Sequence, residues 1–240
     1  MHKKLLVCTV LAVAANAANA FAQRNAPEPL PLGERGCPGP GIACASPINR
    51  PPLFLRAEWK RWPDGKEHPA TPDRVASPNL VLRFYGPSAK DIQLTGTDEL
   101  DPVRLWTGLC TSPIAVALAH KERYVDLTRR ARISWGARTS GYHVVRVVVK
   151  LANGTWLAGD HAFAATEHEY VSEDFAVKDV RWRRLDIDRV VTVGEAVNNP
   201  DLTQVDEIGF ADLMPGSGHG AGGFITVTDI EVYAQPGKRR

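Results

Sequence analysis

The chain has 240 residues, of which 44% are hydrophobic, so it is long enough for one large β domain or two small ones with a real core. Its formal net charge is only +2, because 29 basic residues stand against 27 acidic ones. Binding to nucleic acid through phosphates needs a surplus of basic residues on one surface, so this balance argues against a nucleic-acid partner.

Residues 1–22 have the order of a secretory signal peptide. A positive start at Lys3 and Lys4 precedes an uncharged apolar run over residues 5–15, and small residues lead to an expected cleavage after Ala22, with Ala20 as the alternative. The run is too short to cross a bilayer, and no later segment reaches about 18 apolar residues. We therefore expect a secreted or periplasmic protein with no membrane insertion after signal cleavage, carrying 27 basic and 27 acidic residues.

Residues 23–52 hold eight of the 18 prolines and no periodic apolar pattern, which is typical of a linker or arm. An oxidising compartment permits disulfides, and we expect Cys37 to pair with Cys44 across a short Pro/Gly loop. The alternative pair is Cys44 with Cys110. In the favoured pairing, the remaining thiol of Cys110 is expected to be a buried small hydrophobe and not a nucleophile.

From residue 53 onward the apolar residues repeat every second position, which predicts β-strands. The pattern starts in 53–60 and recurs in 80–84 and 114–118. Further strands are expected near 131–138, 168–176, 180–187, 189–193, 205–211 and 224–233. Turn signals separate these segments and no long amphipathic helix occurs, so the pattern predicts an all-β antiparallel sandwich over 53–235, followed by a basic tail over 236–240.

The clearest local prediction is a β-hairpin. An alternating β-branched strand over 142–151 is followed by Asn153-Gly154 and a return strand from Thr155. Asn and Gly both tolerate positive φ, so a two-residue turn is expected. The more apolar face of the first strand should line the core, and it carries His143, Val145, Val147 and Val149. Arg146 then belongs to the open face.

The six tryptophans fall into two groups by their phase in these strands. Those on the apolar phase, expected in the core, are Trp59, Trp135 and Trp182. Those at turns or strand ends, where a ring can stay exposed, are Trp62, Trp106 and Trp156. Sugar rings stack their C–H faces on aromatic rings, while their hydroxyls pair with groups such as arginine. The best candidate carbohydrate site is an open sheet face with Arg138, Tyr142, Arg146 and Trp156.

Other motifs have simpler interpretations. The Gly-rich stretch 214–223 is not followed by the lysine of a phosphate loop, so it is interpreted as a connection between strands. Asp160-His161 and Glu167-His168 are interpreted as loop residues and not as a metal site. The arginine clusters at 129–132 and 181–184 offer local anion sites, with solvated strand edges as the simpler interpretation.

From Tyr124 onward, the order of elements resembles the galactose-binding-like jelly roll shared by many carbohydrate-binding modules. The matching segments are Asp126–Thr128, Arg132–Trp135, the hairpin, Val180–Ile187, Val205–Phe210 and Phe224–Tyr233. The resemblance covers about half of the chain and implies a jelly-roll β-sandwich. The segment 106–113 lies outside it, so a separate secreted family on the same fold stays open. Fold alone does not define function.

The same resemblance bears on cofactors. Modules of this fold often hold a structural calcium ion between the first and last strands through carboxylate and carbonyl oxygens. Glu58 and Asp229 match those positions, with ordinary surface carboxylates as the alternative. We expect no other cofactor.

These observations predict a secreted, noncatalytic β-sandwich that binds a polysaccharide or oligosaccharide. The first alternative is a glycan-active hydrolase or lyase on a jelly-roll scaffold, which needs two carboxylates or a base such as histidine or tyrosine. Candidates for those roles are Glu169, Glu173, His143 and Tyr142. The second alternative is a protein-interaction domain of the envelope.

Overall fold

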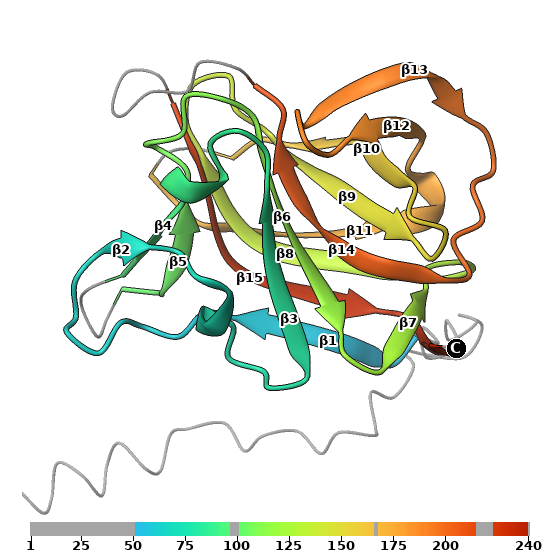
Figure 1. Cartoon of the computed structure of the whole chain (residues 1–240), viewed down its shortest axis with the longest axis horizontal. Coiled ribbons are helices and arrows are strands. Elements are labelled where there is room, and N and C mark those ends of the chain that lie inside the picture. The colour runs from blue at the N-terminus through green and yellow to red at the C-terminus, as the bar shows by residue number, and fades with distance from the viewer. Residues whose placement is uncertain (1–50, 97–100, 166–167, 215–222, 240) are drawn as a thin grey trace, which may run out of the picture. The chain divides into compact units, whose positions relative to one another are not determined.

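The structure, a computed structural model, describes residues 51–96, 101–165, 168–214 and 223–239. These residues form sixteen β-strands in two antiparallel sheets (Figure 1). The predicted all-β antiparallel sandwich is therefore confirmed. The expected signal peptide, most of the proline-rich arm, and the Cys37–Cys44 pair lie outside the described residues.

One sheet has seven strands. Its members are β1 (Leu53–Glu58), β2 (His68–Pro69), β4 (Gln93–Thr95), β5 (Arg104–Trp106), β8 (Arg132–Thr139), β11 (Val171–Ala176) and β15 (Ile225–Tyr233). The strand order is β11-β8-β15-β5-β4-β2, and β1 also pairs with β15. Figure 1 shows β1, in blue, beside β15, in red, and this pairing aligns Glu58 with Asp229.

The other sheet has nine strands. They are β3 (Leu80–Tyr85), β6 (Ile114–His120), β7 (Arg123–Asp126), β9 (Val145–Leu151), β10 (Trp156–Phe163), β12 (Trp182–Asp186), β13 (Val191–Val197), β14 (Val205–Asp212) and β16 (Gln235–Lys238). The order is β13-β12-β10-β9-β14-β6-β3, with β7 paired to β14 and β16 paired to β7. Strand β16 thus occupies part of the stretch expected as a basic tail.

Three short 3-10 segments interrupt the strands of the described residues. They are η1 (Pro72–Arg74), η2 (Ala89–Asp91) and η3 (Val177–Asp179). Among the residues that the structure describes, no helix is long and apolar enough to span a membrane.

The core lies between the two sheets and is filled by the apolar phase of their strands. On β9, Val145, Val147 and Val149 are fully buried in it, as the alternation predicts. From the other sheet, Trp135 is fully buried. Trp59 and Trp182 are also buried, which confirms the core assignment of these three tryptophans. Burial of such apolar area contributes about 25 cal/mol per Å² and dominates the stability of the fold.

The hairpin between β9 and β10 lies where the sequence predicts it, but the two-residue turn is wrong. The amide of Gly154 donates to the carbonyl of Leu151 (2.9 Å), and the amide of Leu151 donates to the carbonyl of Thr155 (2.8 Å). Gly154 has φ +87°, whereas the φ of Asn153 is not positive. This pattern is a three-residue loop in which a turn is followed by a left-handed glycine. Asn153 serves through its side chain instead, whose Oδ1 accepts the amide of Thr155 (2.9 Å).

Candidate functional site

The outer face of the nine-stranded sheet is the face that β9 turns away from the core. Arg146 and Lys150 lie on it and are partly exposed, as the alternation of the strand predicts. The expectation that this face is open is wrong at its centre, however, because a second apolar cluster covers it. The cluster consists of Ala115, Ala117, Val148, Trp156, Ala158, Leu185, Val190 and Ala211.

The turn between β12 and β13 supplies the cover. Its last residue, Val190, is fully buried with φ +52°. Val190 packs against Gly86, where a Cβ atom would lie only 2.6 Å from Val190 Cγ2. Glycine at position 86 therefore permits the turn to approach the sheet closely. Polar groups flank this cluster at two ends.

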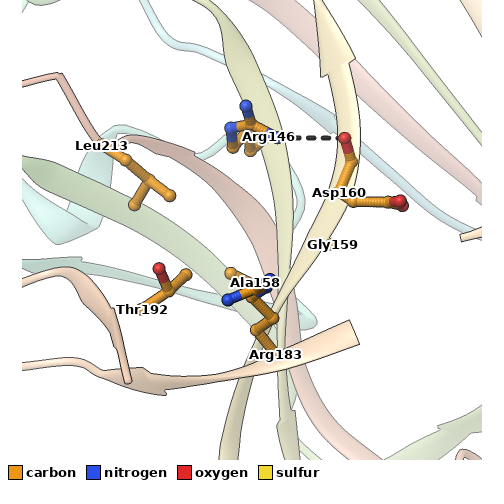
Figure 2. A pocket seen from close by; sticks show the side chains of 7 residues that line it. All are labelled: Arg146, Ala158, Gly159, Asp160, Arg183, Thr192 and Leu213. Carbon is orange, nitrogen blue, oxygen red and sulfur yellow. Dashed lines mark hydrogen bonds between the residues drawn. The ribbon is translucent and has the colours of Figure 1, made fainter. Parts of the chain in front are cut away.

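At one end is a pocket of about 300 Å³ between β9, β10 and the β12–β13 hairpin. It is lined by Arg146, Ala158, Gly159, Asp160, Arg183, Thr192 and Leu213. Figure 2 shows Arg146 and Asp160 at one side of this pocket and Arg183 at another, with Ala158 and Gly159 between them. We call it the β9–β12 pocket.

The charged groups of the β9–β12 pocket differ in their partners. Asp160 is engaged by Arg181, which donates from its backbone amide (2.9 Å) and from Nε (2.7 Å). Burial by itself would raise the pKa of Asp160, but these hydrogen bonds outweigh it and hold the pKa below its ordinary value. Arg146 donates from Nη1 to the backbone carbonyl of Asp160 (3.0 Å) and so is positioned without being neutralised.

At the other end of the cluster, Glu207 on β14 collects three donors. Its fully buried carboxylate accepts from Tyr85 Oη (2.7 Å) and Lys150 Nζ (2.9 Å), and Arg83 Nη1 lies 2.7 Å away. Burial, followed by the hydrogen bond to Glu207, raises the pKa of Tyr85 well above its usual range. The carboxylate is fully occupied within the protein, so this end is a structural polar cluster.

The four predicted binding residues do not form one site. Trp156 is 7% exposed, with its ring edge-on to Tyr85 at 5.0 Å between centroids, so the expected open stacking platform is wrong. Arg138 lies on β8 in the other sheet, and its guanidinium is 4.9 Å from the ring centroid of Tyr170. Tyr142 is 87% exposed and precedes β9 at the end where Arg146 lies.

The residues that complete the pocket around Arg146 come from strands distant in sequence. Arg183 belongs to the cluster 181–184 that the sequence interpretation assigns to solvated edges. Its alternation with the buried Trp182 is the available signal that Arg183 faces outward. No local sequence pattern indicates that Asp160 and Thr192 line the pocket. The pairing of β10 with β12, and of β12 with β13, brings these two residues to it.

Glu58 and Asp229 are cross-strand partners and line a separate hollow, and each carboxylate has a partner within the protein. Arg56 Nη2 lies 2.7 Å from Glu58 Oε1, where a cation would bind. Asp229 Oδ1 accepts from the Thr228 hydroxyl (2.7 Å). Within the described ranges, no group of three or more histidine, cysteine or acidic residues is placed to hold a metal ion. Calcium needs six to eight oxygen ligands.

The candidate residues for catalysis are dispersed. His143 is buried, with Nδ1 2.7 Å from Asp212 Oδ2. Glu173 lies on β11 in the other sheet, where it accepts from Trp135 Nε1 (3.0 Å) and lies 2.8 Å from His161 Nε2. Cys110 is buried, as expected. Burial raises the pKa of its thiol to about 12, which makes it a poor nucleophile.

No protein-family model matches the chain, and no curated protein sequence is significantly similar to it. Similar solved structures include a family 11 carbohydrate-binding module from a cellulosomal cellulase of Clostridium thermocellum, with 12% identity, a TM-score of 0.34, and coverage of 71% of this chain and 87% of that one. An exo-beta-agarase has 10% identity and a TM-score of 0.36, with 72% and 25% covered. PfGH50B has 9% identity and a TM-score of 0.38, with 65% and 23% covered.

The chain therefore spans about a quarter of the length of the exo-beta-agarase and of PfGH50B. Carbohydrate-binding modules, the class that the sequence resembles, are among the similar structures. Since every one of these TM-scores is below 0.5, the likenesses carry no argument about function.

Proposed function

We propose that the chain is an exported, noncatalytic carbohydrate-binding β-sandwich, and that it binds a polysaccharide at the β9–β12 pocket. The observation that carries the proposal is the composition of this pocket, in which Arg146, Arg183 and Thr192 offer hydrogen-bond donors beside the apolar Leu213. Ligand sites of this kind combine a few directed polar groups with apolar surface.

Each lining group has a role in this proposal. The guanidinium donors of Arg146 and Arg183 and the Thr192 hydroxyl pair with sugar oxygens, since several donors in a fixed fork recognise vicinal oxygens well. Leu213 supplies an apolar surface for the C–H face of the ring. Tyr142, exposed at the same end of β9, offers an aromatic surface to a neighbouring sugar unit.

Binding has more support at this pocket than hydrolysis. Glycoside hydrolysis generally uses two carboxyl groups, about 5–10 Å apart, on either side of the scissile bond. The lining residues of the β9–β12 pocket include one carboxylate, Asp160, and Arg181 already holds it. The other lining residues of this pocket carry no carboxyl group that could act as the general acid or the general base.

The test is retention of the full chain on a panel of polysaccharides, with assays for new reducing ends and unsaturated products. We expect retention without products. Arg146→Ala should weaken retention roughly tenfold, about 1.4 kcal/mol, whereas Arg184→Ala on β12 serves as the matched control and should not. Products would favour the enzyme. If the chain is not retained and no products form, a protein-interaction domain is favoured.

A further inference from the structure

The β9–β12 pocket carries positive charge that the described part of the chain does not neutralise. Arg146 and Arg183 line it, and neither makes a salt bridge to a carboxylate within 51–96, 101–165, 168–214 or 223–239. The single acidic lining residue is Asp160, and its carboxylate is taken by Arg181, whose Nε lies 2.7 Å from Asp160 Oδ2. Among the residues that the structure describes, two guanidinium groups therefore border one pocket without a counter-ion, Arg146 being partly exposed and Arg183 exposed.

The placement of the two arginines follows from the sheet. Arg183 is paired with Ala158, and Arg146 is paired with Ala162, so the two arginines flank β10 from opposite sides and at different levels along it. The floor between them is made by the small side chain of Ala158 and the backbone of Gly159 (Figure 2), while a Cβ atom at Gly159 would meet Val147 and Val180 on the core side of the sheet. Arg146 is fixed in direction by its hydrogen bond to the Asp160 carbonyl.

Guanidinium groups bind planar or tetrahedral oxyanions through paired, charge-assisted hydrogen bonds, which are about twice as strong as neutral ones. A neutral sugar placed in this pocket would offer hydroxyl acceptors to the two guanidinium groups but no opposite charge. A sugar with an anionic substituent would compensate them. The volume of about 300 Å³ lies at the lower end of small-molecule pockets, so it suits a single charged unit.

We infer that the polymer recognised at the β9–β12 pocket is an acidic polysaccharide, whose carboxylate or sulfate groups bind between Arg146 and Arg183. This inference rests on the proposed carbohydrate-binding function and adds the chemical class of the ligand. Thr192 and Leu213 contact the remainder of the sugar ring, and the hydrogen bond of Arg146 to the strand keeps its guanidinium directed at the anion.

Affinity electrophoresis of the full chain with matched polymers tests the inference. Polygalacturonate is compared with its methyl ester, and a sulfated galactan is compared with the same galactan after desulfation. We expect at least one acidic polymer to retard the protein about tenfold more strongly than its neutral counterpart. The pair that shows the difference identifies the anionic group as carboxylate or sulfate.

Variants then locate the preference. Arg183→Gln and Arg146→Gln should each abolish most of it, whereas Arg184→Gln makes the same change of charge on the same strand and should leave it intact. Arg183→Lys should restore part of the preference, because it restores the charge without the planar fork. Circular dichroism and melting temperature establish that each variant is folded.

The outcomes separate the inference from the proposed function. Equal retention by acidic and neutral polymers, lowered by Arg183→Gln, would keep carbohydrate binding at this pocket and overturn the acidic ligand. An acidic preference that survives in the Arg146→Gln/Arg183→Gln double variant would also overturn it, since the charge would then act elsewhere. Retention by none of the polymers would contradict both.

Discussion

At the scale of single residues, Gly154 sets the geometry of the β9–β10 hairpin. Its φ is +87°, and a Cβ atom there would meet nothing within 4 Å, so a substitution costs only backbone strain. We predict that Gly154→Val lowers the free energy of unfolding by about 1–2 kcal/mol, measured by urea denaturation. Gly154→Asn should cost less because asparagine tolerates the left-handed region. Equal effects of the two substitutions would contradict the assignment of a left-handed residue at this position.

Tyr85 makes the free energy of unfolding depend on pH in the alkaline range. Burial, and then Glu207, raise the pKa of Tyr85 above 10.0, so the folded state holds the phenolic proton more tightly than the unfolded state does. This stability is present below pH 10 and is lost as pH rises through the folded-state pKa. We predict that the free energy of unfolding falls more steeply above pH 10 in the wild type than in Tyr85→Phe. Parallel pH profiles would contradict a raised pKa of Tyr85 in the folded state.

Glu58 and Asp229 give a prediction about metal removal. Because Arg56 already holds the carboxylate of Glu58, calcium should not bind tightly at this pair. A ligand that binds only the folded state raises the melting temperature. We predict that added calcium or a chelator shifts the melting temperature by less than about one degree. A rise with calcium that is lost in Asp229→Asn would restore this pair as a metal site.

At the scale of elements, the β12–β13 turn decides how much of the outer face is accessible. Val190 is a β-branched residue in the left-handed region, which is unfavourable for its backbone, and its side chain is fully buried on the sheet. We predict that Val190→Ala costs about 1–2 kcal/mol through lost burial. A red shift of tryptophan fluorescence should accompany it as Trp156 becomes exposed. Unchanged stability would mean that the turn contributes no net packing.

The same element explains the limits of sequence-based prediction. Local alternation identifies β9 and β14 and the burial of Trp135, because those depend on which face a strand turns to the core. Alternation could not reveal that Tyr85 packs against Trp156 on the opposite face, or that a distant turn contributes Val190 to the same apolar cluster. Strands β2, β4 and β5 also escape prediction, since two or three residues carry no measurable period.

For the candidate site, the sequence predicts Arg146 and its outward direction but not its neighbours. Arg138 is separated from it by the assignment of β8 to the other sheet, which depends on pairing with β15. Arg183 enters the pocket through the pairing of β12 with β10. Long-range register therefore determines the site, and period-two patterns alone do not specify it.

Across the whole molecule, two hollows lie on different sheets. The β9–β12 pocket has unneutralised arginines, whereas the hollow beside Glu58 and Asp229 lies on the seven-stranded sheet and contains both carboxylates. An anionic sugar should therefore select the first hollow and avoid the second. The location of the bound sugar therefore decides between the two hollows, and a residue-resolved measurement shows it directly.

That measurement is the change in backbone amide chemical shifts of the isotope-labelled chain on titration with oligogalacturonate and with a sulfated galactan oligosaccharide. We predict that, for at least one of the two, the largest changes fall on Ala158, Asp160, Arg183 and Thr192. Changes centred on Glu58 and Asp229, or no saturable changes with either oligosaccharide, would contradict it.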